Sequence, residues 1–366
     1  MTAAAGVGLG PGTRLTTLVR IVLGAFAVAV FVKSAIPVLT TFPVGLDTII
    51  PLKAAERWLD GGVIYVADGF ADLNLLPPFL YPPFVVPLLA PLTVLPEIAV
   101  RWAVVGVLLA LAVLTCRRMA IPWLLVPFVL LWTPMLGGIW AGNVALAMFA
   151  AFIAAFWRTP ARYELEPEPR DLDGREPPDA RIGWLAASVA AVKLTQAQAW
   201  LAIARRSPRA ALLGAVPWIL IVLVTLPLVG VPAYFAWVEQ LARASDPTWE
   251  AMGPSLLQVL PSAVFAVLTV ASFAAALILR GRDTGVWLGI LMLVVTPNMH
   301  VHSALFLMPA LLRIRREFAL LGAMLTGTLT DVGFWLGIVL VVGVMLAGQR
   351  WPVLREPLAA DPVVVG

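Results

Sequence analysis

Long apolar runs separated by short charged blocks make up most of this chain. A mostly apolar run of 18 or more residues is long enough to cross the ~30 Å hydrocarbon core of a membrane as a helix. The pattern predicts an all-α, multi-pass membrane protein of about ten or eleven transmembrane helices, several too short for a straight crossing. The apolar segments are 15–39, 75–96, 98–115, 120–136, 140–157, 183–204, 210–230, 255–279, 284–299, 300–312 and 318–347.

Composition supports a membrane protein. Hydrophobic residues form 61% of the chain and charged residues 13%, about half the charged share of a soluble protein. The apolar run after Arg14 and Arg20 is too long for a cleaved signal, so we expect a retained first helix. The single cysteine, Cys116, excludes an intramolecular disulfide and a cysteine-based metal site. No internal repeat is visible, and we expect residues 1–366 to form a single integral membrane domain.

Basic residues between the apolar segments predict sidedness, because Lys and Arg accumulate in cytoplasmic turns. The net charge of +4 therefore marks orientation rather than nucleic-acid binding. Arg117 and Arg118 would fall on the outer side if every apolar segment crossed once. The turns predicted to be cytoplasmic contain Arg14 and Arg20, residues 205–209, 280–282 and 313–316.

This scheme places three segments on the outer side, and composition marks one further charged loop. The first outer loop is 42–74, the second is 231–254, and residues 296–302 join them on the outer face. Residues 158–181 are Pro-rich and charged with no apolar periodicity, which is typical of a mobile loop.

The first outer loop contains a short amphipathic helix. Between Pro51 and Leu59 the apolar residues share one face, a pattern typical of a helix lying at the membrane surface with Trp58 as its anchor. Asp47 stands just before this helix. One interpretation is that Asp47 or Thr48 caps it.

Several motifs in sequence order resemble the GT-C superfamily, and more narrowly glycosyltransferase family 87, the polyprenol-phosphate-mannose-dependent α-1,2-mannosyltransferases. The resemblance covers most of residues 15–316 and implies a GT-C-like helix bundle. The motifs are Asp47, Ala54-Ala55, Gly61-Gly62, Tyr65 and Tyr81-Pro82-Pro83, then "GNVALAMF" (142–149), "AAVKLTQAQAWLAIARR" (190–206) and "TPNMHVH" (296–302).

This resemblance implies transfer of a hexose, in that family mannose, from a polyprenyl-phosphate donor to a lipid- or glycan-linked acceptor on the outer face. Asp47 would be the general base of an inverting displacement. Lys193 and His302 would stabilise the leaving phosphate. His300, Asn143 and Tyr81 join them as donor-binding residues, and no cofactor or nucleotide motif is expected. The remaining partners would be membrane lipids, and the active site would face the extracytoplasmic side of the cell membrane.

Lys193 stands out independently of the resemblance, because a lysine in the middle of an apolar segment is costly unless it pairs, snorkels or lines a wet cavity. Asp331 is equally conspicuous in the last apolar segment, where it is either a partner for a basic residue or the mark of a break between two half-helices. The second outer loop carries Glu239, Trp249 and Glu250. Their more common role is at the membrane interface, and contact with the acceptor is the alternative.

The only two histidines, His300 and His302, raise the question of a metal site. Residues separated by one lie about 200° apart on a helix, so they would not bind one ion together. We therefore expect no metal. A purely structural role for one histidine stays open, as do two alternatives to an enzyme: a lipid or glycolipid transporter or flippase, and a non-catalytic glycolipid-binding relative.

Overall fold

The computed structural model describes residues 11–66, 78–157, 179–245, 255–281, 283–297, 299–328 and 330–354. Every regular element in these residues is helical, as the apolar pattern predicts. The first half contains α1 (Pro11–Thr41), α2 (Leu46–Leu59), α3 (Val85–Leu89), α4 (Glu97–Arg118), α5 (Val126–Leu131), α6 (Thr133–Trp140) and α7 (Val144–Phe156), with 3₁₀ turns η1 (Ala90–Val94) and η2 (Trp123–Leu125).

The second half is also helical. It contains α9 (Ala180–Val192), α10 (Gln198–Arg206), α11 (Pro208–Val229), α12 (Val231–Ala244), α13 (Leu256–Val259), α14 (Ser262–Ile278), α15 (Thr284–Val294), α16 (Met308–Leu311), α17 (Arg316–Gly327) and α18 (Asp331–Arg350), with 3₁₀ turns η4 (Leu194–Gln196), η5 (Val301–Leu307) and η6 (Pro352–Leu354).

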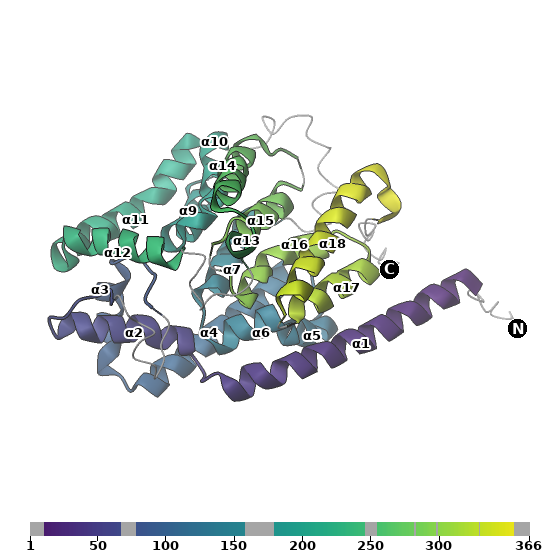
Figure 1. The fold of residues 1–366 in the computed structure, drawn as a ribbon, viewed down its shortest axis with the longest axis horizontal. Coiled ribbons are helices and arrows are strands. Elements are labelled where there is room, and N and C mark those ends of the chain that lie inside the picture. The colour runs from purple at the N-terminus through teal and green to yellow at the C-terminus, as the bar shows by residue number, and fades with distance from the viewer. Residues whose placement is uncertain are drawn as a thin grey trace, which may run out of the picture.

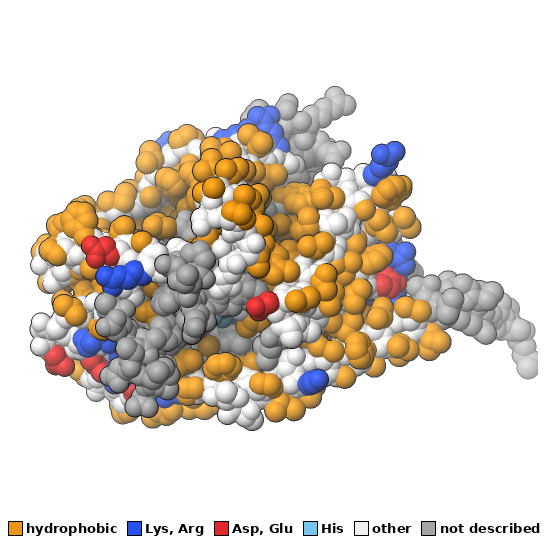
Figure 2. Space-filling view, viewed as in Figure 1, with side chains coloured by type: hydrophobic (Ala, Val, Ile, Leu, Met, Phe, Trp, Pro, Cys, Tyr) orange, Lys and Arg blue, Asp and Glu red, His pale blue; other side chains and the backbone are white. Residues whose placement is uncertain are grey.

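Helix length and surface chemistry identify a polytopic membrane protein. Four stretches of the described residues are long and apolar enough to cross a membrane, and a pair of helices bent by 74° makes a fifth. The face drawn in Figure 2 is mostly hydrophobic, and most of its charged side chains lie toward the two ends of the molecule. Six shorter apolar helices accompany these stretches, so the total of ten or eleven crossings stays a prediction. The stretches are Thr17–Leu59, Glu97–Arg118, Pro208–Val229 and Asp331–Arg350, with the pair Trp123–Leu131 and Thr133–Trp140.

Arg20 and Arg315, from two of the predicted basic turns, lie together beside the N-terminal third of α1, which runs along the edge of the molecule (Figure 1). Arg20 Nε is 2.7 Å from Glu317 Oε1 at the start of α17, and Arg315 contacts the same carboxylate at 3.2 Å. From Arg20 to Thr41, where α1 ends, is about 30 Å at 1.5 Å per residue. Arg20 and the Thr41 end of α1 are therefore separated by about one hydrocarbon thickness.

Arg117 and Arg118 lie in the last turn of α4, and the side of the membrane on which they lie stays a prediction. Helix α4 begins beside the α1–α2 corner, where Arg101 donates to the Val44 carbonyl, and its 22 residues carry the chain about 33 Å away. Segment 75–96 does not form a single crossing, because its prolines leave only α3 and η1, of five residues each.

Small residues bring neighbouring helices close together, which is how membrane helices associate without a hydrophobic driving force. At the α9–α11 crossing, Gly183 and Gly214 face each other so closely that a side chain on either would overlap the other helix. Gly322 and Gly337 play the same part between α17 and α18. These contacts explain why apolar segment 318–347 folds back as a hairpin.

Two other predicted segments differ in the structure. The second outer loop is a helix, α12, over Val231–Ala244, because its apolar and charged residues alternate with helical periodicity. Asp331 is the first residue of α18, directly after a break between two helices, as one interpretation predicted, although α18 is long enough to be a full span rather than a half-helix. Two parts of the predicted loops lie outside the described residues. They are residues 67–77, where the first outer loop ends, and residues 158–178 of the predicted charged loop.

The Glu317 carboxylate makes this end of the bundle sensitive to pH. Burial alone would raise the pKa of Glu317, but hydrogen bonds from Arg20 and Arg315 outweigh burial and hold the pKa at about 2. A carboxylate whose pKa is lowered in the folded state stabilises the fold above its unfolded pKa of about 4.3, and this stabilisation is lost as pH falls toward the folded pKa.

We therefore expect Glu317→Gln to lower the free energy of unfolding by about 0.5–1 kcal/mol at neutral pH. The difference from the wild type should shrink as pH falls from about 4.5 toward 2, when both proteins carry a neutral side chain. Thermal unfolding in detergent across this range measures it. In the Arg20→Gln background the same substitution should have a smaller effect, and an equal effect in both backgrounds would contradict the ion pair's role.

Candidate active site

The corner between α1 and α2 is attached to the end of α6. Gly45, with φ +67°, lies between the two helices, and its N–H donates to the Trp140 carbonyl at 2.7 Å. The Asp47 N–H donates to the Ala141 carbonyl at 2.7 Å. These bonds pair backbone groups left free where both helices end, so the position of Asp47 is set by α6.

The Asp47 side chain is bound by Asn143. Asn143 Nδ2 donates to Asp47 Oδ2 at 2.6 Å, while Asn143 Oδ1 accepts from the Ala145 N–H at 2.7 Å and so caps α7. Capping orients the amide, which leaves its NH₂ group facing the carboxylate. Asn143 therefore orients Asp47 without neutralising its charge.

Asp47 does not cap α2, and neither does Thr48. The N-cap residue is Gly45, which makes no side-chain cap, and Asp47 lies in the first turn of the helix. Thr48 Oγ1 is directed instead toward the Gly142 carbonyl at 3.5 Å. The capping interpretation was wrong because α2 begins at Leu46, five residues before the amphipathic pattern that starts at Pro51.

Tyr81 lies beside this group. Burial raises the pKa of the Tyr81 hydroxyl, and the negative charge of Asp47 raises it further. The phenol is therefore a neutral hydrogen-bond donor at physiological pH. Its backbone carbonyl accepts from the Tyr65 hydroxyl at 2.7 Å, which links two of the tyrosines in the quoted motifs.

Lys193 lies in a break between α9 and α10 rather than inside a continuous helix. Its backbone is extended, with φ −141° and ψ 101°, and only η4 separates it from α10. The break falls inside the predicted apolar segment 183–204, where Thr195, Gln196 and Gln198 follow Lys193. A break exposes backbone groups as well as the ammonium group, so this part of the membrane protein must line a cavity or pack within the bundle.

The two histidines lie together, contrary to the helical geometry expected for them. His300 precedes η5 with an extended backbone, and its ring stacks on that of His302 with centroids 5.2 Å apart and planes 19° apart. The positive charge of Lys193 acts on both rings. Among the described residues no group of three His, Cys, Asp or Glu side chains is arranged to hold a metal ion.

Helix α6 connects the histidine group to the Asp47 group. A Cβ added to Gly138 would lie 3.6 Å from His302 Cβ, so η5 packs against this glycine. The Gly138 carbonyl in turn accepts from the Asn143 N–H at 2.9 Å. His302 packs against one end of the stretch 138–143, and Asp47 is bound by Asn143 at the other end. Both groups therefore lie at the same end of the bundle.

The predicted acceptor residues are only partly described. Glu239 is exposed on α12, which is held next to the Tyr81 segment because Trp237 Nε1 donates to the Leu80 carbonyl at 3.0 Å. Trp249 and Glu250 lie outside the described residues. Acceptor contact stays a prediction for all three.

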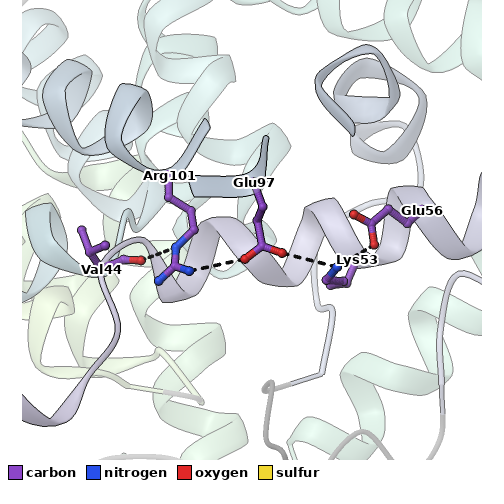
Figure 3. A network of polar contacts seen from close by, with 5 residues as sticks. All are labelled: Val44, Lys53, Glu56, Glu97 and Arg101. Carbon is purple, nitrogen blue, oxygen red and sulfur yellow. Dashed lines mark hydrogen bonds and ion pairs between the residues drawn. The ribbon is translucent and has the colours of Figure 1, made fainter. Parts of the chain in front are cut away.

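One set of residues near the site was missed from the sequence. Lys53, Glu97 and Arg101 are linked by ion pairs beside the α1–α2 corner (Figure 3). The i,i+4 spacing of Glu97 and Arg101 at the start of α4 was visible in the sequence and is typical of an ion pair on one helix face. A charged pair at the end of a span, however, ordinarily marks only the membrane boundary.

Comparison with known proteins gives one match. The model of glycosyltransferase family 87 matches residues 79–336, which is well over half of the chain. The matched range includes Tyr81, Asn143, Lys193 and both histidines, whereas Asp47 precedes it. Nothing among curated proteins matches the chain, and no solved structure does.

Gly142 tests whether the attachment of α2 to α6 sets the position of Asp47. Gly142 has φ +72°, and an added Cβ would overlap Thr48 Oγ1 and lie 3.3 Å from Gly45 Cα. We expect Gly142→Ala to displace α2 and reduce turnover by about tenfold or more, since small displacements of a catalytic group are costly.

The matched control is Gly281→Ala, because Gly281 also has positive φ (+96°) but nothing within 4 Å of an added Cβ. Both variants should lose about 1–2 kcal/mol of stability from left-handed backbone strain. Only Gly142→Ala should lose turnover, measured by mass spectrometry of the glycosylated product. Equal turnover in the two variants would refute the positional role of this contact.

Proposed function

The chain belongs to glycosyltransferase family 87, and on that premise we propose that it transfers a hexose, specifically mannose, from a polyprenyl-phosphate donor. The acceptor is a hydroxyl of a lipid- or glycan-linked molecule at the extracytoplasmic face of the cell membrane. The observation that carries this proposal is a half-buried cation without a carboxylate partner. In the described residues Lys193 makes no ion pair, yet its charge acts on two stacked histidines.

A cation in such a place favours binding of an anion. An unpaired lysine within a membrane bundle costs several kcal/mol, which a bound phosphate offsets through charge-assisted hydrogen bonds. His300 and His302 add donors to the same phosphate. A lipid-linked phosphate reaches this position from the bilayer, which explains why the enzyme needs a membrane fold.

Asp47 supplies the other half of the reaction. Its carboxylate takes the proton of the acceptor hydroxyl as the acceptor oxygen attacks the anomeric carbon of the sugar. The bond between that carbon and the phosphate oxygen breaks, and the polyprenyl phosphate leaves with the bonding electron pair. Lys193 and His302 stabilise its growing negative charge. Attack opposite to the leaving group inverts the anomeric configuration.

Replacement of Asp47 separates base catalysis from a structural role. Asp47→Asn retains the shape of the side chain and its capacity to accept the Asn143 hydrogen bond, but it removes the basicity. We expect normal folding and donor binding, with turnover reduced by about 10²-fold or more. The assay incubates purified protein with polyprenyl-phosphate-mannose and candidate glycolipids, and detects product by mass spectrometry.

Asp60→Asn is the control on the same helix, since Asp60 is an exposed residue at the end of α2. It should keep full turnover. Near-wild-type turnover in folded Asp47→Asn would assign the base to another acid, such as Glu239. Absence of product from the wild type with every acceptor would favour a transporter or a non-catalytic relative.

Replacement of Lys193 tests the phosphate site. Lys193→Met keeps the length and apolar stem of the side chain but removes the charge, so donor affinity should fall by about tenfold or more. Lys33→Met, at an exposed position on α1, should leave affinity unchanged. Binding is measured with the intact lipid-linked donor and with the same lipid lacking the phosphate. Equal affinity for both lipids would exclude phosphate recognition.

A further inference from the structure

Charged residues of α2 and α4 form a continuous ion-pair network, the α2–α4 network, made of Lys53, Glu56, Glu97 and Arg101. Lys53 Nζ lies 2.8 Å from Glu56 and 3.3 Å from Glu97 Oε2. The other oxygen of Glu97 lies 3.3 Å from Arg101 NH1, and Arg101 Nε donates to the Val44 carbonyl at 2.5 Å (Figure 3).

The network contacts the chain on both sides of Asp47. Val44 precedes Asp47 by three residues, and Lys53 follows it by six. Both contacts lead to the first turns of α4, because Glu97 and Arg101 are four residues apart and share one face of that helix. The segment that carries Asp47 is therefore tied to α4 at two points.

Arg101 makes the closest approach to the corner. A Cβ added to Gly45 would lie 2.8 Å from Arg101 Cβ, so the arginine stem packs directly on the glycine. The Arg101 side chain is only 14% exposed, against 35% for Glu97 and 40% for Lys53. Solvent and salt therefore weaken the Arg101 contacts least.

The α1–α2 corner is thus held from two sides. On one side α6 accepts the N–H groups of Gly45 and Asp47. On the other side Arg101 donates to the Val44 carbonyl. Loss of the arginine would leave only the more exposed Lys53–Glu97 ion pair of the network between this segment and α4, so the corner could tilt about its two bonds to α6.

We propose that Arg101 is a positioning residue for Asp47. It acts by fixing the Val44–Gly45 corner, so that the carboxylate stays within proton-transfer distance of the acceptor hydroxyl. The inference rests on the proposed function, because it requires Asp47 to be the base. Displacement of a catalytic group by about 1 Å can lower the rate about 10²-fold.

The test compares Arg101→Gln with Arg117→Gln in the presence and absence of Asp47→Asn. Arg117 is a matched control on the same helix, since it also donates to a backbone carbonyl, that of Ile121 at 2.7 Å, but lies at the opposite end of α4. Turnover and donor KM are measured on purified protein, together with the unfolding temperature.

Arg101→Gln should lower kcat by about tenfold or more with donor KM nearly unchanged. In the Asp47→Asn background the same substitution should have little further effect, because a misplaced base and an absent base are equivalent. Arg117→Gln should leave kcat unchanged, and Arg101→Lys, which retains one donor and the charge, should restore part of the rate. Glu97→Gln, which leaves the Val44 bond in place, should reduce kcat less than Arg101→Gln.

Equal fractional losses from Arg101→Gln with and without Asp47 would overturn the inference, and so would equal losses from the two arginine variants. If Arg101→Gln does not fold, the comparison of Arg101→Lys with and without Asp47→Asn decides by the same criterion. Full turnover in Asp47→Asn alone would overturn the proposed base and the positioning role together. Loss of turnover in Asp47→Asn, with none in Arg101→Gln, would overturn only the positioning role.

Discussion

Helix breaks at one end of the bundle are the constraint on which the rest of the structure depends. A backbone N–H or C=O without a partner in hydrocarbon costs several kcal/mol, so irregular chain survives there only where it is buried in protein or lines a cavity. The break before α2 and the break after α6 satisfy each other, because Gly45 and Asp47 donate to Trp140 and Ala141. The same pairing brings Asp47 to Asn143.

All the polar side chains of the candidate site stand on or next to such breaks. Lys193 follows α9, His300 precedes η5, and Asn143 begins α7. The positions at which the chain leaves helical geometry thus provide both the free backbone groups and the space that a polar ligand requires. Transporter folds use interrupted helices for ion and substrate sites in the same way.

The sequence predicts the long helices well and the interruptions poorly. Helices α1, α4 and α11 begin and end near the predicted limits because a lipid-facing helix must have a minimum apolar length. The hairpin of α17 and α18 and the break at Lys193 are invisible to that criterion, since the few polar residues at each do not lower the apolar content of the whole segment enough to divide it. Stacking of the histidines depends on the extended backbone at His300, which a helical wheel cannot represent.

Candidate site residues were predictable in proportion to how unusual they are in their surroundings. Lys193 in an apolar segment is conspicuous from hydropathy alone, and Asp47 gained its interpretation from the resemblance. Arg101 gave no such signal, because arginine beside the end of a span is common. Its relation to Asp47 requires the contact between Arg101 and Gly45, residues 56 positions apart in the chain.

The separation of opposite charges gives the proposed mechanism its physical consistency. Among the described residues neither Asp47 nor Lys193 is paired with an ion of opposite charge, although both lie at the same end of the bundle. A salt bridge between them would stabilise the resting protein, but it would make the carboxylate a weaker base and leave the ammonium group less able to stabilise a departing phosphate. Asn143 gives Asp47 a neutral partner, and two histidines accompany Lys193. Each charge is thereby retained for the substrate group that changes charge in the transition state, which is the condition for differential stabilisation of that state.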